Sequence, residues 1–262
     1  MRQGFSFIEL SVVLVVIGLL AGAITVGRSL IDVANMDTVI NEAQRFTAAS
    51  ETFRDKYSAL PGDMPNATKY WGMAAPGTAC FDTIGSGTAT CNGDGDGKIS
   101  MCSPLPCNAG TRISGEMFRY WQQLADAKLI TGSFSGVSGF AAGSMRDSVP
   151  GVNVPASRFT GGGWSIEYLG QWAGDSNSFA GNYGNSYSFG GYTGDKTFAP
   201  LLSPLEAATI DQKVDDGQPG TGKVLSTWTY CTTASGPNDL TATYKRNDST
   251  PNKCNLGFVR VI

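Results

Sequence analysis

The first apolar run of the chain is far longer than any other. From Leu10 to Gly27 no charged residue occurs over eighteen positions. A helix rises about 1.5 Å per residue, so roughly 20 apolar residues match the hydrocarbon core of a bilayer. The run therefore predicts a membrane-spanning helix over residues 5–27. Glu9 is an acid at the start of this run, where a charge is costly, so it is a candidate functional residue.

The helical pattern continues beyond the apolar run. Apolar residues recur at spacings of three and four from Val39 to Tyr57, with charged residues between them. Such spacing is typical of an amphipathic helix, and the run Pro61, Gly62 and Asp63 ends it. We therefore expect one helix over 5–57, about 80 Å long. Its first half would face lipid or other helices, and its second half would pack on a globular domain of residues 58–262.

The remaining pattern predicts a mixed domain. Apolar residues form one stripe over 114–130, which indicates a helix, and Ser203, Pro204 and Glu206 form a complete helix start. Alternating segments predict strands at 164–169, 187–192, 224–231 and 256–262. The expected fold class is α+β, with the long N-terminal helix packed on a small antiparallel sheet that carries loop insertions.

The cysteines indicate the compartment of this domain. All six follow the apolar run, and an even number in that position indicates disulfides in an oxidising environment. Reduced thiols in a cytosolic domain are the other interpretation. Short loops close at the lowest entropic cost, so the favoured pairs are Cys80–Cys91, Cys102–Cys107 and Cys231–Cys254. A Cys91–Cys102 bridge is an alternative that would clamp the loop between these two residues.

Composition narrows the chemistry. The chain has no histidine and a net charge of −3. Ser-His and Cys-His nucleophilic pairs and His-ligated zinc are therefore excluded, and no excess of basic residues indicates a nucleic-acid partner. Paired carboxylates acting on glycosidic bonds remain open, but we expect a protein that is not an enzyme.

Oxygen-bearing side chains alternate in the segment 92–99. This spacing matches the first half of an EF-hand-type calcium loop, because alternation points the side chains at one centre. A solvated turn is the other interpretation. Calcium is the one cofactor that the sequence suggests, and the expected ligands are Asn92, Asp94, Asp96, the carbonyl of Lys98 and, as the closing acid, Glu116.

The residues before the apolar run resemble a known processing motif. Gly4 is followed by Phe5, and Glu9 lies four residues further on, with Arg2 in front. This order, GFxxxEL before a bare apolar run, is similar to the N-terminus of type IV pilins and type II secretion pseudopilins. The segments 57–72, 92–130 and 210–224 also resemble parts of prepilin-type proteins.

The resemblance implies a processing pathway and a filament. A prepilin peptidase would remove the leader 1–4 by cutting after Gly4, and Phe5 would be N-methylated. The N-terminal helix would then assemble with other pilin or pseudopilin subunits, and Glu9 would pair with the amine of Phe5 within one subunit or between two. Before assembly the chain would cross the inner membrane once, with its N-terminus in the cytoplasm and residues 58–262 in the periplasm. A pilus would carry it to the cell surface.

Other interpretations fit parts of the chain. The apolar run is also compatible with an ordinary signal peptide, so that the mature chain begins at Ile24, or with a plain uncleaved anchor. The globular domain is also compatible with a carbohydrate-binding or carbohydrate-hydrolysing domain held by a pilin-type anchor. Its site would consist of Glu167, Asp175 and an indole of Trp164, Trp172 or Trp228.

Overall fold

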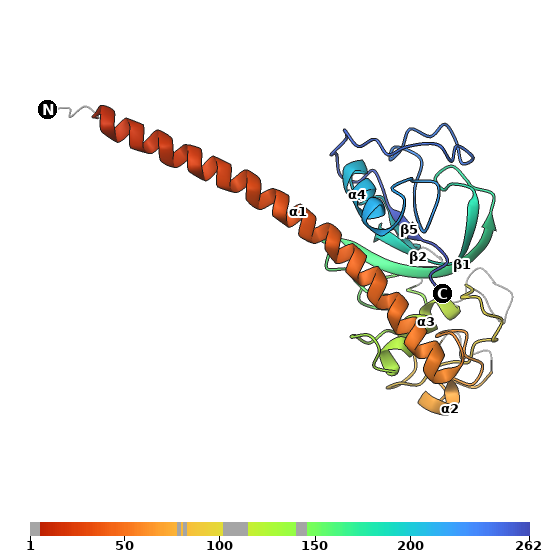
Figure 1. The fold of residues 1–262 in the computed structure, drawn as a ribbon. Helices are drawn as coiled ribbons and strands as arrows, with labels where there is room; N and C mark the ends of the chain where they lie inside the picture. Colours follow the sequence, from red (N-terminus) through yellow and green to blue (C-terminus); the bar gives the residue numbers. More distant parts are fainter. Residues whose placement is uncertain (1–5, 78–79, 81–82, 102–114, 140–145) are drawn as a thin grey trace.

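The computed structural model describes residues 6–77, 80, 83–101, 115–139 and 146–262. One long helix runs out of a mixed domain of helices and antiparallel strands (Figure 1). The coarse α+β expectation is therefore confirmed.

The helix α1 (Phe7–Tyr57) is continuous through both halves of the predicted segment. It ends at Ser58, which adopts a left-handed conformation and donates its N–H to the carbonyl of Arg54. The two halves differ in their surroundings. Large apolar side chains are exposed from Phe7 to Val33, whereas the side chains from Met36 onward that face the domain are buried.

The sheet contains five strands: β1 (Gly162–Trp172), β2 (Gly181–Tyr192), β3 (Thr197–Ala199), β4 (Val224–Ser226) and β5 (Leu256–Phe258). Their order is β1-β2-β5-β4, with β3 also paired to β2, and all pairs are antiparallel. The two C-terminal strands are shorter than predicted. Tyr230 and Arg260 adopt positive φ angles, which extended backbone does not tolerate, so neither predicted strand reaches its expected end.

Three shorter helices accompany the sheet: α2 (Thr68–Trp71), α3 (Glu116–Asp126) and α4 (Pro204–Val214). The predicted start of α4 is confirmed, because Ser203 Oγ accepts the N–H of Glu206 (3.3 Å) and the Glu206 carboxylate accepts the N–H of Ser203 (2.8 Å).

The helix α3 is buried on more than its predicted stripe. Its residues from Glu116 to Ala125 are all buried. Its polar side contacts the two residues of the Cys80–Cys91 disulfide. Arg119 donates to the carbonyl of Cys80 (2.8 Å), and Gln123 donates to that of Cys91 (3.1 Å).

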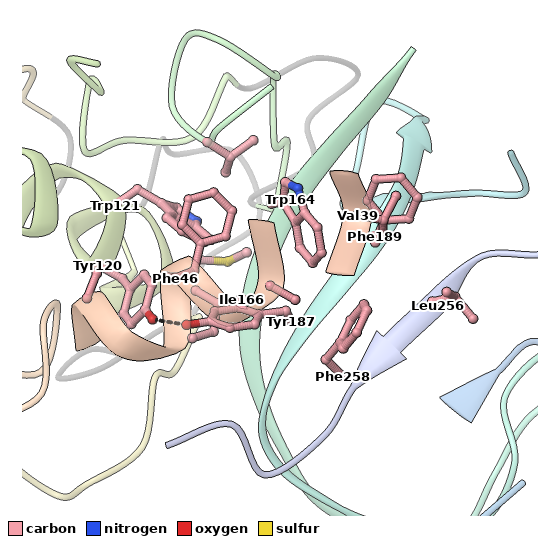
Figure 2. Packing of buried hydrophobic residues seen from close by; sticks show 14 of the residues in the cluster. Val39, Phe46, Tyr120, Trp121, Trp164, Ile166, Tyr187, Phe189, Leu256 and Phe258 are labelled. Atoms are coloured by element: carbon pink, nitrogen blue, oxygen red, sulfur yellow. Dashed lines mark hydrogen bonds between the residues drawn. The ribbon is translucent and has the colours of Figure 1, made fainter. Parts of the chain in front are cut away.

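The ring of Phe46, on α1, lies at the centre of the core (Figure 2). Its centroid is 5.0 Å from that of Trp121, 5.6 Å from that of Trp164 and 6.2 Å from that of Tyr187, each in an edge-to-face arrangement. Such pairs stabilise by about 0.5–1.5 kcal/mol each beyond the burial of their area. The second half of α1 is therefore part of the core.

A buried carboxylate adds a polar tie between α1 and β1. Glu42 Oε2 accepts hydrogen bonds from Ser157 Oγ (2.6 Å) and Trp164 Nε1 (2.7 Å), and Oε1 accepts the N–H of Arg158 (2.9 Å). The indole of Trp164 is fully buried. It therefore cannot be the exposed ring that a carbohydrate site requires.

The structure contains two of the predicted disulfides. Cys80 is joined to Cys91, with their Cα atoms 5.9 Å apart, and Cys231 to Cys254, with their Cα atoms 5.1 Å apart. The pairing of Cys102 and Cys107 lies outside the described residues. The second bridge ties the segment after β4 to the start of β5, next to Leu202, whose N–H donates to the carbonyl of Cys254.

Replacing Glu42 should destabilise the domain strongly. Glu42→Ala leaves the N–H of Arg158 and the indole N–H of Trp164 without their acceptor, which we expect to lower the free energy of unfolding by about 3 kcal/mol. Glu51→Ala, on the exposed side of the same helix, is the matched control, with a change of about 0.5 kcal/mol or less. Denaturant unfolding of the detergent-solubilised chain measures both, and equal midpoints for the two variants would contradict the role of Glu42.

Candidate functional site

Glu9 lies in the first turn of α1, exposed, and caps its own helix. Its Oε2 accepts the N–H of Ser6 (2.8 Å), and Ser6 Oγ accepts the N–H of Ile8 (3.3 Å). This arrangement is a capping box, and an acid in the first turn also favours the helix dipole. The sequence carries the signal for it in the spacing of Ser6 and Glu9, which the interpretation of Glu9 as an assembly residue overlooked. Gly4 and Phe5 lie outside the described residues.

The segment after Glu9 has no cover in the structure. Within the described residues, Phe7–Ile24 is the one stretch that is long and apolar enough to cross a membrane, and none of it is buried. Monomeric soluble proteins rarely expose an apolar surface of this extent, and such surfaces mark contact with lipid or with other proteins. By length and composition, this segment is compatible with a single membrane span or with a signal sequence.

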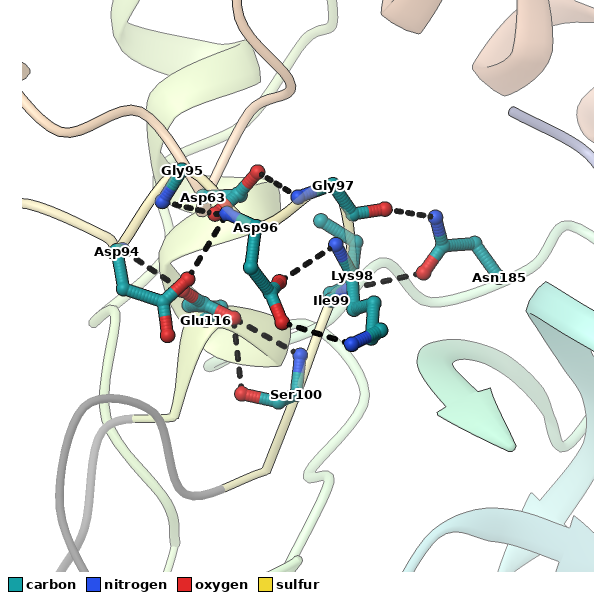
Figure 3. A network of polar contacts seen from close by, with 10 residues as sticks. All are labelled: Asp63, Asp94, Gly95, Asp96, Gly97, Lys98, Ile99, Ser100, Glu116 and Asn185. Carbon is teal, nitrogen blue, oxygen red and sulfur yellow. Dashed lines mark hydrogen bonds and ion pairs between the residues drawn. The ribbon is translucent and has the colours of Figure 1, made fainter. Parts of the chain in front are cut away.

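Residues 92–100, the acidic loop, fold around the carboxylate of Asp63 (Figure 3). Asp63 Oδ1 accepts the N–H groups of Gly95 (2.6 Å) and Asp96 (3.1 Å), and Oδ2 accepts that of Gly97 (2.9 Å). The sequence prediction missed this role of Asp63, because Asp63 was interpreted, with Pro61 and Gly62, only as the end of the first helix.

Gly62 is required at this point of the chain. Its φ angle is +83°, and a Cβ atom there would lie 2.4 Å from the carbonyl oxygen of Glu116. The backbone before Asp63 therefore approaches the start of α3 more closely than any residue with a side chain allows. This contact brings Asp63 and Glu116 to the same loop.

Glu116, the first residue of α3, closes the loop from the other side. Its Oε1 accepts the N–H of Asp94 (3.1 Å), and its Oε2 accepts both the N–H and the hydroxyl of Ser100 (2.9 Å each) (Figure 3). The sequence prediction made Glu116 the closing ligand of a calcium ion. The structure brings Glu116 to the loop, but it is not among the acids whose oxygens come together there as a group that could hold a metal ion. The oxygens of Glu116 bind groups at the two ends of the loop.

Three carboxylates come together here. Asp63, Asp94 and Asp96 each offer an oxygen, and these oxygens lie within 4.8 Å of one another, so that the group could hold a metal ion. Asn92 differs from the prediction, since its Oδ1 accepts the N–H of Thr68 (2.9 Å) at the start of α2. Lys98 directs its ammonium to Asp96 (3.1 Å), where it would compete with a bound cation.

Burial changes the titration of two of these acids. It raises the pKa of Asp63 to about 6, against the opposing effect of the N–H groups of Gly97 and Gly95 and with a further increase from the charges of Asp94 and Asp96. It also raises the pKa of Glu116 to about 7, and the nearby charge of Asp63 adds to this shift. At neutral pH the loop therefore holds negative charge that either a proton or a cation would stabilise.

In chelator, the folded protein should become more stable as the pH falls from 8 to 5. The carboxyls of Asp63 and Glu116 titrate near pH 4 when unfolded, so the folded chain binds more protons in this window. The stability that this uptake adds is fully present below about pH 4 and is lost as the pH rises through 6 and 7. The melting temperature, followed by circular dichroism, should rise by a few degrees as the pH falls from 8 to 5.

Burial raises the pKa of Asp126 to about 6 and that of Asp211 to about 7 as well, so the slope must be assigned by a variant. Glu116→Gln cannot titrate and should flatten the profile in chelator. An unchanged slope in this variant would contradict the assignment.

Comparisons with protein-family models, with curated proteins and with solved structures find no match for this chain. A functional conclusion therefore depends on its own residues: an uncovered apolar helix with an acid in its first turn, and an acidic loop at the far end of the same helix.

Proposed function

We propose that the chain is a structural subunit of a type IV pilus or of a type II secretion pseudopilus. The observation that carries this proposal is the division of α1. Its first part, Phe7–Ile24, has no buried residue, and the same continuous helix then enters the core of the domain. The GFxxxEL motif at Gly4 to Leu10 supports the proposal from the sequence.

This division suits a subunit that exchanges one apolar environment for another. In the inner membrane the bare half of α1 contacts lipid tails, and in a filament it contacts the same half of neighbouring subunits. A prepilin peptidase removes residues 1–4, and Phe5 is N-methylated. The domain stands in the periplasm, which is consistent with the disulfides Cys80–Cys91 and Cys231–Cys254.

Glu9 can serve such an assembly as well as its own helix. Cleavage after Gly4 creates an amino group on Phe5, beside the Ser6 N–H that Glu9 accepts. An incoming subunit could instead pair its Glu9 with the amine of the subunit added before it, and two such charges attract far more strongly in low dielectric than in water. This pairing would set the axial register, while the apolar side chains supply packing.

A pair of variants separates the two roles of Glu9. Glu9→Gln keeps a side chain that can cap the helix but removes the charge, whereas Glu9→Ala removes both. We expect both variants to be cleaved and folded, and both to yield filaments at about a tenth of the wild-type level or less. Sheared filaments are quantified by immunoblot from cells that carry the complete assembly machinery. Filaments at wild-type levels with Glu9→Gln would show that Glu9 acts only as a cap.

The N-terminus of the mature protein tests the proposal as a whole. Mass spectrometry should find a methylated Phe5 at the start of the chain, and Gly4→Val should leave the full-length precursor in the membrane. A mature chain that begins at Ile24 would identify an ordinary signal peptide and refute the filament function.

We also propose that the ion held by Asp63, Asp94 and Asp96 is calcium. Hard carboxylate oxygens suit this ion, and its flexible coordination accepts an irregular set of ligands. The N–H groups donated to Asp63 orient its carboxylate, and Oδ2, which accepts only the N–H of Gly97 among the described residues, keeps a lone pair for an ion. Calcium would hold the loop between the end of α1 and the start of α3 in its ionised form.

Melting curves with and without calcium test this ion. For an affinity of roughly 10⁻⁴–10⁻³ M, calcium at about 10 mM should add about 1.4–2.7 kcal/mol, or roughly 3–10 °C. Asp94→Ala should remove this increment and leave melting in chelator nearly unchanged. Asp55→Ala, which removes an acid from the exposed surface of α1, should retain the increment. Identical wild-type curves in calcium and in chelator would refute the calcium site.

A further inference from the structure

A cavity of about 260 Å³ lies on the face of the sheet that is turned away from α1. The ring of Tyr187 on β2 contacts Phe46 of α1, so the alternation of side chains along a strand directs Ser186 and Ser188 to the opposite face. Both serines line the cavity. Its volume is below the roughly 300–1,000 Å³ of sites for drug-sized molecules, which limits a ligand to one or two rings.

Apolar rings and chains form one side of this cavity. Gly184 has a φ angle of +55° and lies at a shift in the β1–β2 register. The side chain of Tyr183 therefore joins Leu169 and Leu225 in a small apolar cluster separate from the main core. The indole of Trp172 lines the same cavity and is 38% exposed. A flat apolar ring is thus accessible at the rim.

The basic residues of the cavity are each paired with a carboxylate. Lys196 Nζ is 2.6 Å from Glu167 Oε2, and Arg146 Nη2 is 3.0 Å from Asp195 Oδ2. Glu167 is not among the residues that line the cavity. These ion pairs compensate the positive charges of the wall, so the cavity has no excess of positive charge to attract an anionic ligand.

Two hydroxyl groups in this wall have no partner. Ser186 Oγ and Thr227 Oγ1 are buried and form no hydrogen bond with any described residue, and both residues line the cavity. Buried polar groups are nearly always hydrogen-bonded, so an unpaired one requires an explanation such as a bound molecule. Two such hydroxyls at one cavity point to a ligand that carries hydroxyl groups of its own.

An oriented acid completes the set. Asp175 Oδ1 accepts the N–H groups of Asn177 (2.8 Å) and Ser178 (2.6 Å), and Trp228 donates its indole N–H to the carbonyl of Asp175 (3.0 Å). The loop that carries Asp175 is therefore fixed against the segment after β4. Asp175 lines the cavity, and a carboxylate there can accept hydrogen bonds from hydroxyl groups of a ligand.

We propose that this cavity binds a neutral saccharide, with a pyranose ring stacked on Trp172 and its hydroxyl groups paired with Asp175, Ser186 and Thr227. This function is separate from filament assembly and does not depend on it. Of the residues expected for a carbohydrate site, Trp172 and Asp175 line the cavity, and Trp228 donates a hydrogen bond to the carbonyl of Asp175. Trp164 lies in the core, and Glu167 is not among the lining residues.

Titration of the full chain with cellobiose and with lactose, two neutral disaccharides, tests the proposal. The protein is purified in a zwitterionic detergent, because a detergent with a sugar head group would compete for the cavity. We expect saturable binding in the millimolar range, measured by isothermal titration calorimetry because Trp172→Ala removes the indole on which a fluorescence signal would depend. Trp172→Ala should weaken binding about tenfold and leave the melting temperature nearly unchanged.

Ser186→Ala and Ser165→Ala separate binding from stability. Ser186→Ala should weaken binding roughly threefold to tenfold without lowering the melting temperature of the free protein, because its hydroxyl has no partner to lose. Ser165, on the same face of β1, accepts a hydrogen bond from Thr197 (3.0 Å), so Ser165→Ala should lower the melting temperature and leave binding unchanged.

Two results would overturn the proposal. A lack of saturable binding with either sugar would mean that the cavity holds solvent only. Equal affinities for the wild type, Trp172→Ala and Ser186→Ala would place the sugar elsewhere on the chain.

Discussion

The edge-to-face contacts of Phe46 join the long helix to α3 and to the sheet. The residue belongs to α1, and its ring partners Trp121, Trp164 and Tyr187 come from α3, β1 and β2. Loss of so large a buried side chain typically costs about 3–5 kcal/mol, because a cavity replaces it. The long helix is therefore locked to the domain at its second half, and the direction in which its bare first half leaves the domain follows from the same contacts.

Buried carboxylates hold the loops of the domain in place by accepting hydrogen bonds from their backbone N–H groups. Much of this domain is irregular, and the N–H groups of irregular backbone need acceptors when they are buried. Glu42 supplies them for the segment before β1, and Asp63 and Glu116 supply them for the acidic loop. Asp211 on α4 accepts the N–H of Gly217 and the hydroxyl of Tyr244 in the same way. The raised pKa values of Asp63, Glu116 and Asp211 reflect how deeply these acids are placed.

Local signals in the sequence predicted well what is local in the structure. The length of α1, the start of α4 at Ser203 and the Cys80–Cys91 pair depend on spacing, capping or short loops. Features that join distant segments were missed or misplaced. Asp63 meets the acidic loop only because Gly62 packs on α3, and Asn92 is taken by α2 instead. Likewise, four sections of chain meet at the cavity, and a bulge at Gly184 decides which side of the sheet Tyr183 joins. The hydrophobic periodicity of one segment does not reveal contacts between segments that are distant in the sequence.

The two faces of the sheet suit two separate tasks. The face with Trp164 and Tyr187 is covered by the second half of α1. Contacts between subunits through the bare first half of α1 would therefore extend from the helix that covers this face. The cavity with Trp172 opens on the other face, where α1 does not pack. In the proposed filament, subunits that join through their helices would therefore leave the cavity free of the helical contacts. A saccharide bound there would not have to compete with assembly, because the residues that would bind it and the residues that would join subunits lie on opposite sides of one sheet.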